Sequence, residues 1–110
     1  EPASHYGRPF AWHWQIASKD LISPWTRVKA PVFVIYGAYD QYETRRGHRL
    51  IVDTVNRAKP GRAAWLEIPQ ADHDLDIYPD PRAAYRDEGG RRDLSLFVTP
   101  VVDWLKRVTR

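Results

Sequence analysis

The sequence contains no cysteine and no methionine. Without cysteine the chain forms no disulfide bond and no thiolate metal site, and cysteine usage gives no information on the redox compartment. Because the chain also opens at Glu1-Pro2, the lack of methionine indicates that it is part of a longer polypeptide. We therefore expect some of the residues that a complete site needs to lie outside these 110.

Long apolar runs and a strong charge of one sign are missing as well. No segment approaches the roughly 20 apolar residues of a membrane-spanning helix, and no signal-peptide pattern is present. The 17 Lys and Arg residues against 14 Asp and Glu give a net charge of +3, spread along the chain. A nucleic-acid-binding protein normally shows a denser basic stripe. We therefore expect neither nucleic acid nor a membrane as a partner.

The residues that are present suit one small domain. Hydrophobic residues make up 43% of the chain, and 5 Trp, 6 Tyr and 3 Phe supply large side chains for a core. An aromatic-rich lead-in occupies residues 1–25. Within it we expect a helix over about residues 10–19, with Pro9 in its first turn, and a turn or short helix at Ser23-Pro24.

Alternating strands and helices are predicted for residues 26–110. Residues 30–37 form a short apolar run between a proline and a glycine, typical of a strand buried on both faces of a parallel sheet. Residues 63–68 are predicted as a second strand. Helices are predicted at 43–58 and 94–108, and Pro100 should kink or restart the second of them. In the helix at 43–58, the predicted apolar face consists of Leu50, Ile51 and Val55, with Val52 at its margin.

The order strand, helix, strand, helix predicts the fold class α/β. A parallel strand pair joined by a right-handed helical crossover is the expected geometry. Two parallel strands alone leave unpaired edges, so the sheet should be incomplete and belong to a larger one. The long polar stretch at 69–92 predicts an active-site loop, an embedded short helix or disorder.

Two titratable residues follow the predicted strands. Asp40 comes just after the first strand, and His73 just after the second. Ligands of open α/β sheets bind beyond the carboxyl ends of the strands, and neighbouring strands lie about 4.8 Å apart. The two side chains should therefore meet. A carboxylate that accepts the Nδ1 proton of a histidine leaves Nε2 to take a proton from a hydroxyl nucleophile.

The sequence around these two residues resembles a known family. Residues 25–40, W-x-x-V-K-A-P-V-F-V-I-Y-G-A-Y-D, and residues 66–73, L-E-I-P-Q-A-D-H, look like the last two strands of α/β-hydrolases. The resemblance is to the esterases and peptidases related to prolyl oligopeptidase and dienelactone hydrolase, and it covers roughly residues 25–110. It implies that Asp40 is the acid and His73 the base of a catalytic triad that cleaves ester or peptide bonds of a small-molecule or peptide substrate.

The chain departs from this family in two respects. Asp74 stands where the family often has glycine, which adds negative charge beside the base. No Gly-x-Ser-x-Gly nucleophile elbow is present, and the oxyanion-hole loop is absent too. Since the family order is Ser, acid, His, a C-terminal portion would contain only the last two. We expect the nucleophile on an N-terminal remainder or a companion chain, and no hydrolysis by this chain alone.

Three further residues are candidates for the site, on less specific grounds. Tyr39 and Gln41 flank the acid and are expected at the pocket mouth, although a purely structural role fits them equally well. The lead-in aromatic residues, Trp12 among them, either pack in the core and over the sheet or, as the end of a cap region, form a pocket wall. No metal and no cofactor are expected.

Alternatives to catalysis remain open at this point. Asp40 taken alone could cap the following helix or shape a turn, and His73 could be an exposed loop histidine. The alternative for the whole chain is a non-catalytic α/β module, or a truncated fragment, that self-associates as a homo-oligomer through its exposed sheet edge.

Overall fold

The element order in the structure follows the predicted alternation of strands and helices. The structure is a computed structural model that describes residues 4–5 and 7–110, so part of the lead-in, residues 1–3 and 6, lies outside the described residues. The elements are β1 (Ser4–His5), β2 (Arg8–Pro9), α1 (Phe10–Ala17), the 3-10 helix η1 (Ser23–Arg27), β3 (Val32–Gly37), α2 (Arg45–Ala58), β4 (Ala63–Ile68), β5 (Asp76–Ile77), α3 (Pro81–Arg86), β6 (Arg91–Arg92) and α4 (Ser95–Val108).

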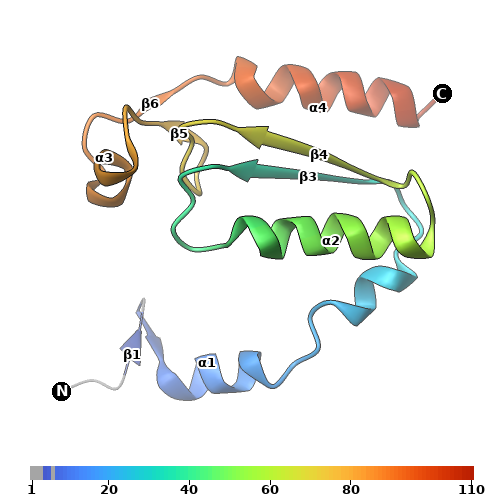
Figure 1. The fold of residues 1–110 in the computed structure, drawn as a ribbon, viewed down its shortest axis with the longest axis horizontal. Coiled ribbons are helices and arrows are strands. Elements are labelled where there is room, and N and C mark those ends of the chain that lie inside the picture. The colour runs from blue at the N-terminus through green and yellow to red at the C-terminus, as the bar shows by residue number, and fades with distance from the viewer. Residues whose placement is uncertain (1–3, 6) are drawn as a thin grey trace.

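The central layer is a parallel pair of strands. β3 and β4 run side by side, with Val32 opposite Ala63 and Gly37 opposite Ile68. The helix between them, α2, covers one face of this sheet, and α4 covers the other (Figure 1). The α/β class and the parallel pairing are thus confirmed. Within the described residues no further strand joins β3 or β4.

The core on the α2 side is built from valines. Val52 and Val55 are 4% and 1% exposed, whereas Leu50 is 40% exposed. The prediction that Leu50 belongs to the apolar face and Val52 to its margin was therefore wrong. At about 100° of rotation per residue, Leu50 lies about 200° from Val52, so both cannot face the sheet. Position in the helix, not side-chain size, decides which residue is buried.

On the opposite face of the sheet, α4 packs through aromatic side chains. Trp104 lies 5.3 Å from the ring of Phe33 on β3, measured between ring centroids, and Phe97 packs beside a buried cluster that includes Ile68. No residue of α4 is fully buried. The helix runs without a break from Ser95 to Val108, so Pro100 does not restart it as predicted.

The N-terminal helix α1 lies beyond α2, on the side away from the sheet (Figure 1). Its aromatic side chains are open to solvent: Phe10 is 55%, Trp12 41% and Trp14 79% exposed. None of the residues of α1 is buried. The expectation that these aromatic residues pack in the core or over the sheet was therefore wrong for α1. None of the described helices is long and apolar enough to cross a membrane.

The polar stretch at 69–92 is ordered around a short helix. It contains α3 and the two-residue antiparallel pair of β5 and β6. The phenol of Tyr78, which is 2% exposed, donates a hydrogen bond to the carboxylate of Asp87. Gly90 lies so close to the Tyr78 ring that a Cβ there would come within 2.6 Å of it. The embedded short helix, one of the predicted possibilities, is observed.

Candidate active site

Asp40 lies in a turn at the carboxyl end of β3. Its backbone N–H donates to the carbonyl of Gly37 at 2.9 Å, which closes the turn. Its side-chain Oδ1 accepts two further backbone N–H groups, from Tyr42 and Glu43, both at 2.8 Å. The N-cap of α2 is Thr44, whose hydroxyl accepts from Gly47 N–H at 2.9 Å. Asp40 therefore shapes the turn rather than capping the helix.

His73 lies in a tight loop just after β4. The carboxylate of Asp72 accepts the backbone N–H groups of Asp74 and Asp76, each at 3.0 Å. The N–H of Asp72 donates to the carbonyl of Asp76 at 3.0 Å, and Leu75 takes the left-handed conformation with φ of 66°. These contacts fold residues 72–76 into a compact turn that carries His73. Asp72 is a site residue that the sequence analysis did not identify.

Backbone contacts connect the two loops directly. Ala38 N–H donates to the carbonyl of Ile68 at 3.0 Å, and Tyr39 N–H donates to that of Ala71 at 2.7 Å. Gly37 makes this approach possible, because a Cβ on it would come within 2.3 Å of the carbonyl oxygen of Asp72. Only a residue without a side chain fits here.

These contacts bring the predicted acid and base together. The Nδ1 of His73 lies 2.8 Å from the Oδ2 of Asp40. The Asp40 side chain is 3% exposed, whereas that of His73 is 45% exposed. Since a carboxylate can only accept, Nδ1 carries the proton and Nε2 is the basic nitrogen. The predicted contact between carboxylate and imidazole is confirmed.

The surroundings favour the charged form of both residues. Burial of the Asp40 carboxyl favours its neutral form, but the hydrogen bonds from Glu43 N–H, His73 and Tyr42 N–H together lower its pKa below the usual value. The hydrogen bond to Asp40 is the main reason why the pKa of His73 is raised, with partial burial acting against it and the charges of Asp40, Asp74 and Glu43 adding to it. Asp74 therefore makes His73 more basic, as its extra negative charge predicts.

A groove of about 820 Å³ opens beside His73. From α1 and the residues before it come Arg8, Trp12, His13 and Ile16, and from the sheet side come Tyr42, Glu43, His73 and Asp74. The Tyr42 and His73 rings meet edge to face, with 5.4 Å between their centroids. Of the three predicted pocket residues, Trp12 lines the groove, whereas Tyr39 and Gln41 are not among its lining residues. Tyr42 was not predicted.

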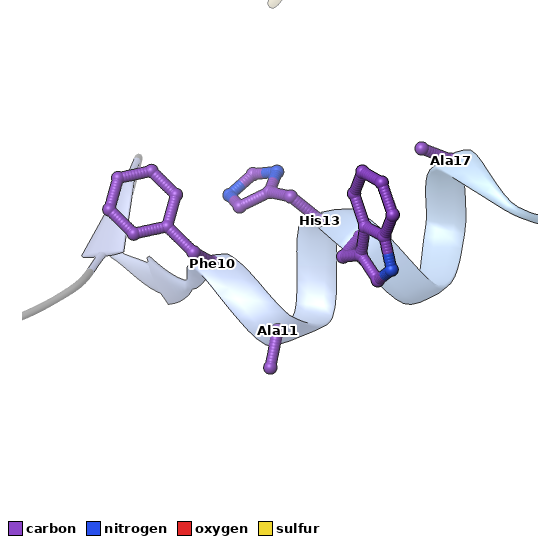
Figure 2. Close-up of a pocket in the computed structure, with 5 residues that line it drawn as sticks. Phe10, Ala11, His13 and Ala17 are labelled. Atoms are coloured by element: carbon purple, nitrogen blue, oxygen red, sulfur yellow. The ribbon is translucent and has the colours of Figure 1, made fainter.

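A second hollow, of about 530 Å³, lies on α1 itself. Phe10, His13 and Ala17 project to the same side of the helix, while Ala11 points the other way (Figure 2). All its lining residues belong to this one helix, and neither Asp40 nor His73 is among them. It is an open apolar surface rather than part of the acid–base site.

The described residues contain no group of three or more His, Cys, Asp or Glu side chains arranged to hold a metal ion. Within the acidic run at residues 72–76, the Asp72 carboxylate accepts backbone N–H groups of the turn, and the Asp76 carboxylate accepts from the Nε of Arg92 at 2.8 Å. These two carboxylates therefore stabilise the loop that carries His73.

Comparison with known proteins gave no match to a family model, to a curated protein or to a solved structure. The resemblance of residues 25–40 and 66–73 and the geometry of Asp40 and His73 are therefore what supports a function for this chain.

Proposed function

We propose that this chain supplies the acid and the base of a serine hydrolase that cleaves ester or peptide bonds. One observation carries the proposal: Asp40 Oδ2 holds His73 Nδ1 at 2.8 Å at the carboxyl ends of two adjoining parallel strands. The sequence resemblance to the last two strands of α/β-hydrolases supports the same assignment.

Each residue of this pair has a defined chemical role. Asp40 fixes the imidazole tautomer and stabilises the imidazolium that forms when His73 accepts a proton. The exposed His73 ring presents Nε2 as the base that takes the proton of an attacking hydroxyl and later returns it to the leaving group. The two N–H donors on Oδ1 hold the carboxylate in place, so that Oδ2 stays aimed at the ring.

The nucleophile and the oxyanion hole come from outside the chain in this proposal. The groove beside His73 has no Ser, Thr or Cys among its described lining residues. The remaining portion of the enzyme, on a longer polypeptide or a companion chain, must therefore place its serine next to His73.

A fluorophosphonate probe tests the proposal in the protein that contains this chain with that remaining portion. We expect covalent labelling of one serine, and a fall of about 10⁴-fold in labelling rate for Asp40→Asn, with His73→Ala at least as slow. Asp103→Asn, which changes an exposed carboxylate on α4, is the matched control and should label at the parent rate.

Two results would contradict the proposal. The first is an active, folded protein that the probe does not label on any serine. The second is labelling of the 110-residue chain alone at one of its own serines, because the proposal places the nucleophile elsewhere. The first result would remove the serine-hydrolase assignment, and the second would place the nucleophile within this chain.

A further inference from the structure

The imidazole of His73 is hydrogen-bonded to the acid at one of its two nitrogens. Its Nδ1 lies 2.8 Å from Asp40 Oδ2, and the side chain is 45% exposed. Hydrogen bonds tolerate a broad range of angles, so a ring held at one atom can tilt and swing Nε2 without losing that bond. The direction of Nε2 matters for a general base, because a misplacement of about 1 Å can cost about 100-fold in rate. The base therefore needs a second contact on its ring.

Tyr42 makes this second contact. Its ring meets the His73 ring edge to face, with 5.4 Å between the centroids and 64° between the planes. Aromatic pairs prefer such edge-to-face arrangements, at centroid distances of about 4.5–7 Å. The contact restrains the plane of the imidazole, which the hydrogen bond at Nδ1 leaves free to tilt.

The main chain of the same residue holds the acid. Tyr42 N–H donates to Asp40 Oδ1 at 2.8 Å, while Oδ2 of the same carboxylate faces His73. A rotation of the carboxylate that moved Oδ2 would therefore also disturb the hydrogen bond at Oδ1. Tyr42 thus contacts both members of the pair, the acid through its backbone and the base through its ring.

Packing in the core does not account for the Tyr42 ring. Tyr36 and Tyr78 are 6% and 2% exposed and belong to the core, whereas Tyr42 is 55% exposed, in the loop between β3 and α2. A side chain that is half exposed buries little apolar area and contributes little to stability. The ring instead lines the groove of about 820 Å³ that His73 also lines. Its position is that of a site residue.

We propose that Tyr42 is a positioning residue for the base: its ring limits the orientations of the His73 imidazole, while its N–H holds the Asp40 carboxylate. The consequence for catalysis rests on the proposed function. With Nδ1 turned to Asp40, Nε2 lies on another side of the imidazole, and the groove gives a hydroxyl access to it. Since the contact joins two rings, the aromatic ring of Tyr42 acts in this role and its hydroxyl does not.

The side-chain rotamers of His73 in the 110-residue chain test the contact directly, through three-bond NMR couplings that report χ1. Tyr42→Leu keeps an apolar side chain but removes the ring. It should lower the ratio of the main rotamer to the others by about 3- to 10-fold, the range expected for the loss of one aromatic pair. Tyr42→Phe keeps the ring and should restore the parent ratio. An unchanged ratio in Tyr42→Leu, or an equal loss in Tyr42→Phe, overturns the proposal.

Two controls separate this effect from a general loosening of the chain. Tyr85→Leu removes a ring that is 76% exposed on α3 and should leave the His73 rotamers unchanged. An equal change in Tyr85→Leu overturns the proposal, because the effect would not be specific to Tyr42. Tyr42→Leu should also unfold at the same urea concentration as the parent. If it unfolds at a lower concentration, the ring serves the fold and the positioning role is refuted.

In the protein that contains the chain with its remaining portion, the fluorophosphonate probe separates positioning from binding. Tyr42→Leu should lower the maximal labelling rate by about 3- to 10-fold, and the probe concentration that gives half of this rate should stay within about two-fold of the parent value. Tyr42→Phe should recover the maximal rate. A change confined to the half-maximal concentration would make Tyr42 a wall of the groove only, and overturns the positioning role.

Failure of this role is distinguishable from failure of the proposed function. The rotamers of His73 report the contact with Tyr42 whether or not a serine is labelled. Labelling that is lost in His73→Ala but unchanged in Tyr42→Leu leaves the hydrolase assignment intact and refutes the role of Tyr42 alone.

Discussion

Replacing Gly37 by alanine should separate Asp40 from His73 without touching either side chain. The Cβ of alanine would lie 2.3 Å from the Asp72 carbonyl oxygen and 2.5 Å from that of Ala71, both backbone atoms. Since such contacts stay above 3.0 Å, the loop must retreat by at least 0.7 Å, the difference between 3.0 and 2.3. A shift of that size strains the Tyr39–Ala71 hydrogen bond and moves the residue next to His73.

The expected cost follows from these contacts. Overpacking against backbone typically destabilises by about 1–3 kcal/mol, and losing one backbone hydrogen bond adds about 1 kcal/mol. Urea unfolding of the chain should therefore show a clear fall in the free energy of unfolding. If the proposed function holds, a displacement approaching 1 Å should lower the rate of serine labelling in the assembled protein by about 100-fold.

The same substitution at Gly47 is a suitable control. Gly47 lies inside α2, where the nearest described atom to an added Cβ, apart from the helix backbone and the chain neighbours, is the Thr44 hydroxyl oxygen at 3.1 Å, on a side chain that can adjust. Alanine is the better helix former, so Gly47→Ala should be neutral or stabilising by up to about 1 kcal/mol. If Gly37→Ala unfolds at the same urea concentration as the parent and labelling is unchanged, the close approach of the two loops does not hold the pair together.

Three further perturbations follow from the structure. Val55→Ala should lower the free energy of unfolding by about 1–3 kcal/mol, whereas Leu50→Ala should change it by less than about 0.5 kcal/mol, in the same urea assay. A larger effect of Leu50→Ala would contradict the observed exposure of Leu50. The pKa of His73 is raised on folding, so its contribution to stability is complete below the unfolded value of about 6.5 and is lost as the pH rises through the folded value. Asp40→Asn should lower the His73 pKa in an NMR titration. An unchanged His73 pKa would contradict the hydrogen bond. The hydrogen bond to Asp87, with burial and nearby carboxylates, raises the pKa of Tyr78 to about 12. In an ultraviolet titration, Tyr78→Phe should therefore remove the tyrosine ionisation step near that pH. Removal of a step near pH 10 instead would refute the raised pKa of Tyr78.

The strands and the crossover were predictable because their signals are local and strong. β4 was predicted at the observed residues, and β3 within two residues of its start, because continuous apolar runs between proline and glycine specify buried strands. The sheet-facing side of α2 was harder to predict. Leu50 and Val52 are both apolar, and only the direction in which α2 crosses the sheet decides which of them is buried.

For the site, the sequence predicted which residues meet but not what holds them. Asp40 and His73 could be identified because each follows a predicted strand. The contributions of Gly37, Asp72 and Tyr42 depend on how closely two loops approach and on where a ring turns, neither of which shows as a periodicity. The Asp-x-Asp spacing at 72–74 was a usable signal, since aspartates that accept N–H groups two residues ahead form tight turns. The exposed aromatic residues of α1 could not be separated from core residues by composition.

The turn contacts of Asp40 are compatible with its proposed role as a triad acid. Its Oδ1 accepts the N–H groups of Tyr42 and Glu43, and its Oδ2 faces His73, so the turn contacts and the histidine contact use different oxygens. The turn contacts themselves favour the chemistry, because two N–H donors stabilise the charged carboxylate that the imidazolium needs. Mutations that loosen the turn should therefore also weaken the hydrogen bond that raises the pKa of His73.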